Sequence, residues 1–427
     1  MFTAYLPLLK NRDFFLLWLG QILSQFGDRL TQMAIVGLVY QAQGVSSFTL
    51  AKMFSLSIIP VFLVSPVAGV YIDRWDKRKT MYTSDFLRAG FLCLIPIFYL
   101  QYKNLAPLYV LIFLSFCVGK MFVPAKMAMI PFLVRDKDLL KANSLISLTS
   151  MIAAVLGLGL GGVLVEKCGA PAALYINAAT FLVSAMLVFF MGVKDATHHF
   201  KVKDLIEMSR EAVLRVEQSV VFEATPGIRF ILKSPATRYA VAMKILLFAV
   251  LGSLYTIFIV FIQHTFNTVT KDLGWLAISA GAGLFAGTVL YGRWGHRFAV
   301  KPAFNISLLA CGAWLTAMVM VLNVWPAKLF AVAACFLLGI LCSPLEIGIN
   351  TLIHQDSGSQ NGFLGRVFSS LEVLLHLAFI IFMFAASCLA EKYSAFAVIV
   401  GVGLIVFSFA AVQLILGSSR KREEVLL

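Results

Sequence analysis

Asp28 is a carboxylate inside an apolar run, and three glutamines repeat around it at helical spacing. Gln21, Gln25, Asp28 and Gln32 are four, three and four residues apart, so a helix places them on one face. A charged group inside a bilayer is costly and occurs where it meets a partner or a ligand. We therefore expect this face to avoid lipid and Asp28 to bind a proton or the cationic part of a ligand. A structural Asp paired with a neighbour is the alternative.

Other candidate groups are less specific. Arg29 follows Asp28, but adjacent residues do not share a helix face, so Arg29 is expected to bond to another helix or to receive an anionic group. His264 and His376 can titrate near neutral pH but belong to no recognisable set of ligands, and packing or an interfacial position is the plainer reading. The sequence has no phosphate loop, nucleophile elbow or metal-binding His pair, so we predict no enzyme, no cofactor and no metal site.

The elements that carry these residues are apolar runs long enough to cross a bilayer. The chain has 427 residues, of which 60% are hydrophobic and 13% charged, with a mean hydropathy of +0.90. A soluble domain could not cover so much apolar surface. We predict an all-α integral membrane protein with twelve transmembrane helices, near 14–41, 48–72, 79–101, 105–130, 143–165, 171–193, 238–263, 273–292, 302–323, 326–350, 364–390 and 394–417.

The net charge of +14 is unevenly distributed over the loops. Loops on one side hold 24 Lys and Arg residues, whereas the opposite loops hold five: Lys103, Lys167, Lys271, Lys328 and Lys392. Because basic loops stay in the cytoplasm, both termini are expected there, in a multi-pass protein of a bacterial-type inner membrane. The distribution argues for a lipid bilayer as the partner rather than nucleic acid. Residues 1–13 lack the pattern of a cleaved signal peptide.

A long polar stretch divides the chain into two similar halves. We predict a six-helix bundle at 1–193, a cytoplasmic linker at 194–237 and a second six-helix bundle at 238–427. The linker is read either as an amphipathic helix on the membrane surface or as a solvated segment. Gly69-x-x-x-Asp73-Arg74 in the first half and Gly292-x-x-x-His296-Arg297 in the second are 223 residues apart.

Lys126 and Glu346 occupy equivalent positions in a second repeated segment, at an offset of 220 residues. A parallel duplication places a transport path between the halves and exposes it alternately by rocking. We expect Lys126 and Glu346 to pair across the repeat axis as a gate. Separate partners for each residue are the alternative.

The segment Gly69-Val-Tyr-Ile-Asp73-Arg74-Trp75-Asp76-Lys77-Arg78-Lys79 resembles the loop signature of the major facilitator superfamily. Its Asp-Arg-Trp-Asp core looks like the branch of macrolide-efflux proteins and enterobactin-type siderophore exporters. Gly27-Asp28-Arg29, Pro226-Gly227-Ile228-Arg229 and Gly365-Arg366-Val367-Phe368 resemble the same branch. The run Gly157-Leu158-Gly159-Leu160-Gly161-Gly162 lacks the proline that proton-coupled exporters often carry there, and close helix packing is its plainer role.

The resemblance implies a fold and a function. It implies the major facilitator fold, in which helices one, four, seven and ten surround the cavity, so that the stripe of Asp28 lines the path. It implies a monomeric transporter that exports a small drug-like or siderophore-like molecule in exchange for protons.

The loop motif is expected to stabilise one access state. The motif comprises Gly69, Asp73, Arg74, Lys77, Arg78 and Arg88. Its charged members would form a cytoplasmic cluster, to which Asp85 could belong. A positive loop that only sets the topology is the alternative.

Two other substrates stay open, a lysophospholipid and a divalent metal ion. The metal reading arises because ferroportin-like carriers also have Gly-Asp-Arg in helix one. A receptor or scaffold that does not transport is a further alternative.

Overall fold

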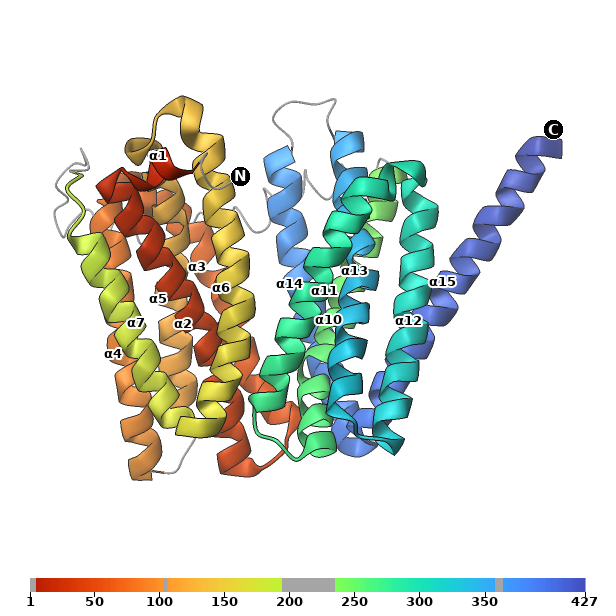
Figure 1. Cartoon of the computed structure of the whole chain (residues 1–427), viewed down its shortest axis with the longest axis horizontal. Coiled ribbons are helices and arrows are strands. Elements are labelled where there is room, and N and C mark those ends of the chain that lie inside the picture. The colour runs from red at the N-terminus through yellow and green to blue at the C-terminus, as the bar shows by residue number, and fades with distance from the viewer. Residues whose placement is uncertain (1–4, 103–105, 194–234, 358–363, 427) are drawn as a thin grey trace. The chain divides into compact units, whose positions relative to one another are not determined.

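The computed structural model describes residues 5–102, 106–193, 235–357 and 364–426, and its helices are drawn in Figure 1. Side chains are described within these ranges except at 65–74, 100, 102, 235–237, 296, 352–357, 364–370 and 416–426. The described part contains no strand. Its twelve long helices confirm the predicted all-α fold.

The first six long helices are α2 to α7, preceded by the one-turn helix α1 (Leu6–Leu9). Their bounds are α2 Arg12–Gln43, α3 Ser47–Arg74, α4 Lys77–Tyr102, α5 Ala106–Leu133, α6 Leu139–Cys168 and α7 Ala170–Phe189. The other six are α10 Pro235–Phe266, α11 Lys271–Trp294, α12 Val300–Val324, α13 Lys328–Ser357, α14 Leu364–Lys392 and α15 Ala395–Leu426. Short 3₁₀ turns precede α6 (Asp136–Asp138) and α12 (Gly295–Arg297).

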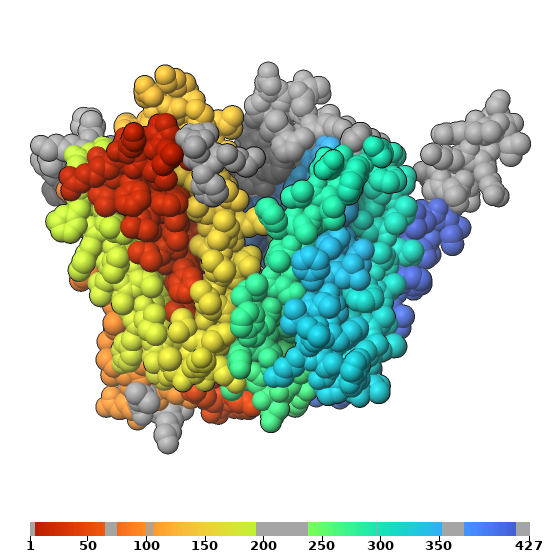
Figure 2. Space-filling view, viewed as in Figure 1, coloured from red at the N-terminus to blue at the C-terminus, as the bar shows by residue number. Residues whose placement is uncertain are grey.

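Eleven of these helices have the length and hydropathy of membrane spans, by composition alone. The helix outside this set is α2, which carries Gln21, Gln25, Asp28, Arg29 and Gln32. Exposed apolar side chains gather on α7, where Ile176, Val183, Met186 and Phe189 are all exposed. This helix lies in the yellow-green region of Figure 2.

The helices form two compact units, Met1–Gly44 with Lys52–Val221 and Val45–Ala51 with Phe222–Leu427. Equivalent helices pair in the same way in each. In the first unit α2 packs on α6, α4 on α7 and α4 on α5; in the second α10 packs on α14, α12 on α15 and α12 on α13. This correspondence supports the predicted six-helix repeat. The predicted linker, 194–237, falls almost wholly outside the described residues, so its boundaries stay a prediction.

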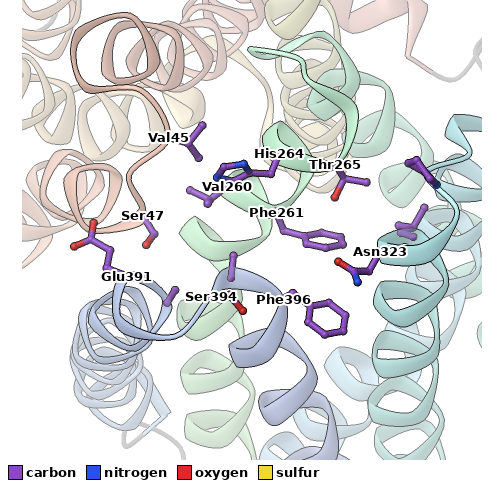
Figure 3. Close-up of a pocket in the computed structure, with 14 residues that line it drawn as sticks. Val45, Ser47, Val260, Phe261, His264, Thr265, Asn323, Glu391, Ser394 and Phe396 are labelled. Atoms are coloured by element: carbon purple, nitrogen blue, oxygen red, sulfur yellow. The ribbon is translucent and has the colours of Figure 1, made fainter.

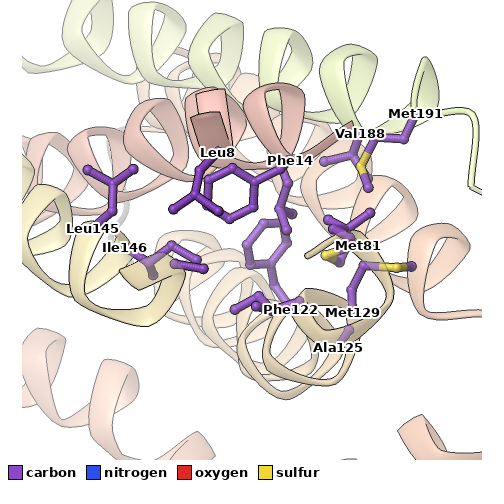
Figure 4. Close-up of a cluster of buried hydrophobic side chains, with 14 residues drawn as sticks. Leu8, Phe14, Met81, Phe122, Ala125, Met129, Leu145, Ile146, Val188 and Met191 are labelled. Atoms are coloured by element: carbon purple, nitrogen blue, oxygen red, sulfur yellow. The ribbon is translucent and has the colours of Figure 1, made fainter. Parts of the chain in front are cut away.

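A buried apolar cluster fixes one end of α2 in the first unit. Phe14 and Leu17 of α2 pack there with Met81 of α4, Phe122 of α5 and Ile146 of α6 (Figure 4). The second unit has its own core around α10, α12, α13, α14 and α15. Because the interior is closely packed, this cluster holds the first turns of α2 in place and so helps to position the polar residues in the middle of the helix.

Polar contacts reinforce the start of α2. Asn11 caps the helix, accepting from the backbone N–H groups of Asp13 at 3.0 Å and Phe14 at 3.2 Å. Its Nδ2 donates to the carbonyl of Leu133 at 2.7 Å. The carboxylate of Asp13 accepts from the N–H of Gly192 at 2.8 Å. The start of α2 is therefore tied to the end of α5 and to the segment after α7.

Candidate functional site

Arg88 on α4 lies between two carboxylates of the first unit. Its Nη2 forms an ion pair with Oδ1 of Asp28, and its Nη1 lies 3.5 Å from Oδ1 of Asp85. The three side chains differ in exposure: Arg88 is 5% exposed, Asp85 is fully buried and Asp28 is 37% exposed. One arginine therefore joins a buried carboxylate to one that is accessible.

Asp85 is held by hydroxyl groups from two other helices. Ser184 of α7 donates to its Oδ2 at 2.6 Å, and Ser24 of α2 approaches its Oδ1 at 3.5 Å. Asp85 and Arg88 share a face of α4 because they are three residues apart. The carboxylate thus links α2, α4 and α7 at the depth of Asp28.

The guanidinium of Arg88 is enclosed by packing as well as by charge. Its Cζ lies 3.9 Å from the centroid of the Phe181 ring, a cation–π contact. Gly119 of α5 leaves room on another side, because a Cβ there would lie 3.1 Å from Cζ of Arg88. Nε of Arg88 is buried without a hydrogen-bond partner among the described residues. Packing therefore restricts the group to its two carboxylate partners.

A cavity of about 200 Å³ opens beside this network. It is lined by Ser24, Gln25, Asp28, Arg29, Arg88, Gly119, Phe122, Val123 and Lys126. Lys126 is buried and interacts electrostatically with Asp28. Three basic groups and the two carboxylates give the site a formal charge of +1. It can hold a proton on Asp28 or attract an anionic group.

The predicted stripe on α2 divides between two environments. Gln25 and Asp28 line the cavity. Gln21 is fully buried against α6, donating to Oγ of Ser150 at 2.7 Å and to the carbonyl of Ile146 at 3.3 Å. Gln32 accepts from Nη1 of Arg29 at 3.1 Å, one turn along the same helix. Gln21 therefore serves packing between α2 and α6, whereas Arg29 has a partner other than Asp28.

The proposed gate residues lie in different units, and each is described within its own. Lys126 borders the cavity of Asp28. Glu346 on α13 accepts from Nδ2 of Asn350 at 3.1 Å. Their pairing stays a prediction.

The loop motif is described only in part. The side chains of Gly69, Asp73 and Arg74, and that of Arg366, lie outside the described residues. Asp76 immediately precedes α4, and its Oδ1 accepts from the N–H of Lys79 at 2.9 Å, as a capping residue does.

The other basic residues of the motif are braced by aromatic rings. Lys77 lies over the ring of Phe132 at 5.6 Å and Arg78 over that of Phe189 at 5.8 Å. Arg88 is placed with Asp28 and Asp85 rather than with Lys77 and Arg78.

The second unit holds a larger pocket of about 760 Å³, shown in Figure 3. The segment Val45–Ala51 belongs to this unit, and Glu391 accepts there from Oγ of Ser46 at 2.8 Å and from the N–H of Phe48 at 3.2 Å. His264 lines the same pocket. In the described residues no group of three or more His, Cys, Asp or Glu could hold a metal ion.

Sequence reasoning missed the partnership of Arg88 with Asp28 and the role of Asp85. The signal that could have found them is their spacing, since two ionisable residues three apart lie within an otherwise apolar span. Ser24 and Ser184 gave no such signal, because serine is common in packed helices.

Comparisons with known proteins agree with this architecture. The family model described as the Major Facilitator Superfamily matches residues 17–370. The chain is 26% identical over 395 residues to the uncharacterized MFS-type transporter YfiS of Bacillus subtilis (strain 168), covering 90% of this chain and 88% of the relative. It is 22% identical over 384 residues to macrolide efflux protein A of Streptococcus pyogenes, covering 89% of each.

A solved structure is similar over nearly the whole chain. It is the crystal structure of a bacterial homologue of the iron transporter ferroportin in an inward-facing state, with a TM-score of 0.69 and 16% identity. The match covers 94% of this chain and 98% of the other. At this identity the likeness concerns the fold alone.

Proposed function

The chain belongs to the major facilitator superfamily, and we propose that it exports a small amphiphilic molecule in exchange for protons by alternating access. Membership makes it a multi-pass membrane transport protein and not an enzyme. The relative named for macrolide efflux supports the direction and the amphiphilic cargo. We also propose that both termini lie in the cytoplasm, that the protein is a monomer and that it resides in the inner membrane.

The observation that carries the proposal is the unequal exposure of the two carboxylates that share Arg88. Asp28 is accessible from the cavity, whereas Asp85 and Arg88 are buried. A proton that binds the Asp28 carboxylate removes its charge and weakens its pair with Arg88. The guanidinium then keeps Asp85 as its charged partner. Protonation thus biases α2 and α4 between two arrangements, as a coupled transporter requires.

The groups around Asp28 favour this reading. Charged neighbours come from three helices: Arg29 on α2, Asp85 and Arg88 on α4, and Lys126 on α5. The described residues of α6 and α7 bring neutral polar groups to α2 and α4: Ser150 bonds to Gln21, Asn177 to Thr31 and Ser184 to Asp85. Gln25 and the aliphatic face of Val123 provide an amphiphilic wall for cargo.

Transport in proteoliposomes tests the proposal. Vesicles with an acidic lumen should accumulate radiolabelled erythromycin, and nigericin should abolish the accumulation. Protein-free vesicles measure the passive trapping of this weak base. We expect Asp28→Asn to lose the gradient-driven part, with a residual rate of about a tenth or less. Asp138→Asn, at the start of α6 beside Arg135 and Lys141, is the matched control and should keep the activity.

The same vesicles examine the other two substrate classes. A fluorescent lysophospholipid and Mn²⁺ are offered in place of erythromycin. Transport of either one without erythromycin transport rejects the proposed cargo. Full gradient-driven activity of Asp28→Asn rejects proton coupling through this residue.

A further inference from the structure

A second charged pocket lies wholly within the second unit, where α10 packs on α13 and α14. Its volume is about 400 Å³, and it is lined by Lys244, Phe248, Glu346, Leu371, Glu372, Leu375 and His376. The titratable groups therefore come from all three helices that form the pocket. Neither Glu372 nor Lys244 was a candidate in the sequence.

The carboxylates of this pocket are not neutralised by its one lysine. Nζ of Lys244 donates to Oδ1 of Asn350 at 2.7 Å, and Nδ2 of Asn350 donates to Oε1 of Glu346 at 3.1 Å. Asn350 thus stands between the ammonium and the carboxylate. Among the described residues neither Glu346 nor Glu372 has an ion-pair partner. With His376 neutral, two carboxylates and one ammonium leave the pocket with a formal charge of −1.

Aromatic and aliphatic groups complete the wall. The ring of Phe248 lies 6.3 Å from that of His376, and Leu371 and Leu375 are buried beside them. Nδ1 of His376 lies 2.8 Å from the carbonyl oxygen of Glu372, which fixes the ring. A ring face and carboxylates around one apolar space are the features that bind an organic cation. A small hydrated metal ion would gain nothing from the leucines and Phe248.

We propose that this pocket binds the cationic group of an amphiphilic molecule, with Glu346 and Glu372 as its counter-charges and Phe248 against its apolar part. The proposal rests on the export function above and narrows its cargo to organic cations. Lys244 opposes binding by its charge, so it limits affinity.

Equilibrium binding to the purified full chain in detergent tests the site without any gradient. The probe is radiolabelled tetraphenylphosphonium, and tetraphenylborate is an anion of nearly the same size and shape. We expect the cation to bind more tightly than the anion. Glu346→Gln with Glu372→Gln should weaken cation binding about tenfold or more, because the double variant removes both negative charges that attract the cation.

Two variants separate the charge effect from damage to the fold. Lys244→Gln keeps a donor for Asn350 but removes the positive charge, so it should tighten cation binding about threefold or more. Misfolding would not increase affinity. Glu391→Gln, at the other end of α14 and in a different pocket, is the matched control and should bind as the native chain does.

Three outcomes overturn the proposal: an unchanged affinity in the double glutamine variant, equal affinity for the two ions, or loss of cation binding only in Asp28→Asn. These results are separate from those for transport. If the cation binds with the expected pattern but erythromycin uptake is not driven by pH, the binding site is supported and the exchange mechanism is rejected. If erythromycin uptake is driven by pH but the cation does not bind with the expected pattern, the exchange mechanism is supported and the binding site is rejected.

Discussion

Arg88 illustrates how one side chain can serve two acids at the residue scale. It is shared between Asp28, which borders a cavity, and Asp85, which is fully buried. A buried ion pair is weak evidence of stability, because desolvation offsets the attraction between the charges. Removing only one partner is different, because it leaves an uncompensated charge in the interior. Loss of Arg88 alone should therefore lower the stability of the first unit.

Arg88→Met should destabilise the first unit by about 3–5 kcal/mol, since Asp85 then keeps its burial without its counter-charge. Thermal unfolding in detergent, followed by tryptophan fluorescence, should show a lower midpoint. Asp85→Asn combined with Arg88→Met should recover part of the loss. Arg135→Met is the control because the Arg135 side chain is 74% exposed, and it should change stability by about 1 kcal/mol or less. Equal midpoints for Arg88→Met and the native chain would contradict this account.

Close packing of α2 on α6 is the feature that matters at the scale of elements. A Cβ on Gly157 would lie 2.8 Å from Cβ of Arg29 and 3.0 Å from the carbonyl oxygen of Phe26. The glycine thus lets the two backbones approach beside Asp28. Any larger side chain must push α2 away from α6, and Asp28 moves with α2.

Gly157→Val should therefore reduce gradient-driven erythromycin transport at least several-fold and destabilise the bundle by about 1–3 kcal/mol through overpacking. The initial rate in proteoliposomes and the unfolding midpoint measure the two effects. Gly90→Val on α4 is the matched control, because nothing lies within 4 Å of a Cβ at that position. Full transport by Gly157→Val would show that this contact does not position Asp28.

The helices themselves were predictable because each apolar run has to satisfy its backbone within the bilayer. The run predicted at 14–41 is α2, Arg12–Gln43, and its polar face was visible from spacing alone. The periodicity could not show that Gln21 meets Ser150 while Asp28 meets Arg88, since both contacts join residues far apart in sequence. Tertiary partners of polar groups depend on helix packing and not on local pattern.

The two units carry pockets of opposite formal charge at the scale of the whole molecule. The site of Asp28 in the first unit has three basic and two acidic groups. The pocket of Glu346 in the second has one basic and two acidic groups, with His376 neutral. Opposite charges attract, so this difference in sign is compatible with the proposal that Lys126 and Glu346 pair when one side of the transporter closes.

Charge reversal tests that gate. Lys126→Glu and Glu346→Lys should each slow erythromycin transport about tenfold, because each variant brings like charges together on closure. The double reversal restores the attraction between the two positions and should transport several-fold faster than either single variant, although it still lacks the Glu346 carboxylate that we propose as a counter-charge for the cargo. The control combines Lys137→Glu with Glu391→Lys, which makes the same two charge changes at positions outside the proposed gate. This double variant should transport no faster than its two single variants. A double reversal no better than the worse single variant would reject the pairing.

The membership of Val45–Ala51 in the second unit has a consequence for biosynthesis. Ser47 at the start of α3 donates to the carbonyl of Ser387, which follows 340 positions later in the chain. At about 5–20 residues per second, the ribosome needs roughly 20–70 s to supply that partner. During this interval the hydroxyl group of Ser47 lacks that acceptor. Co-translational folding of this chain therefore includes a late step, in which α14 supplies the hydrogen-bond acceptor for Ser47 at the start of α3.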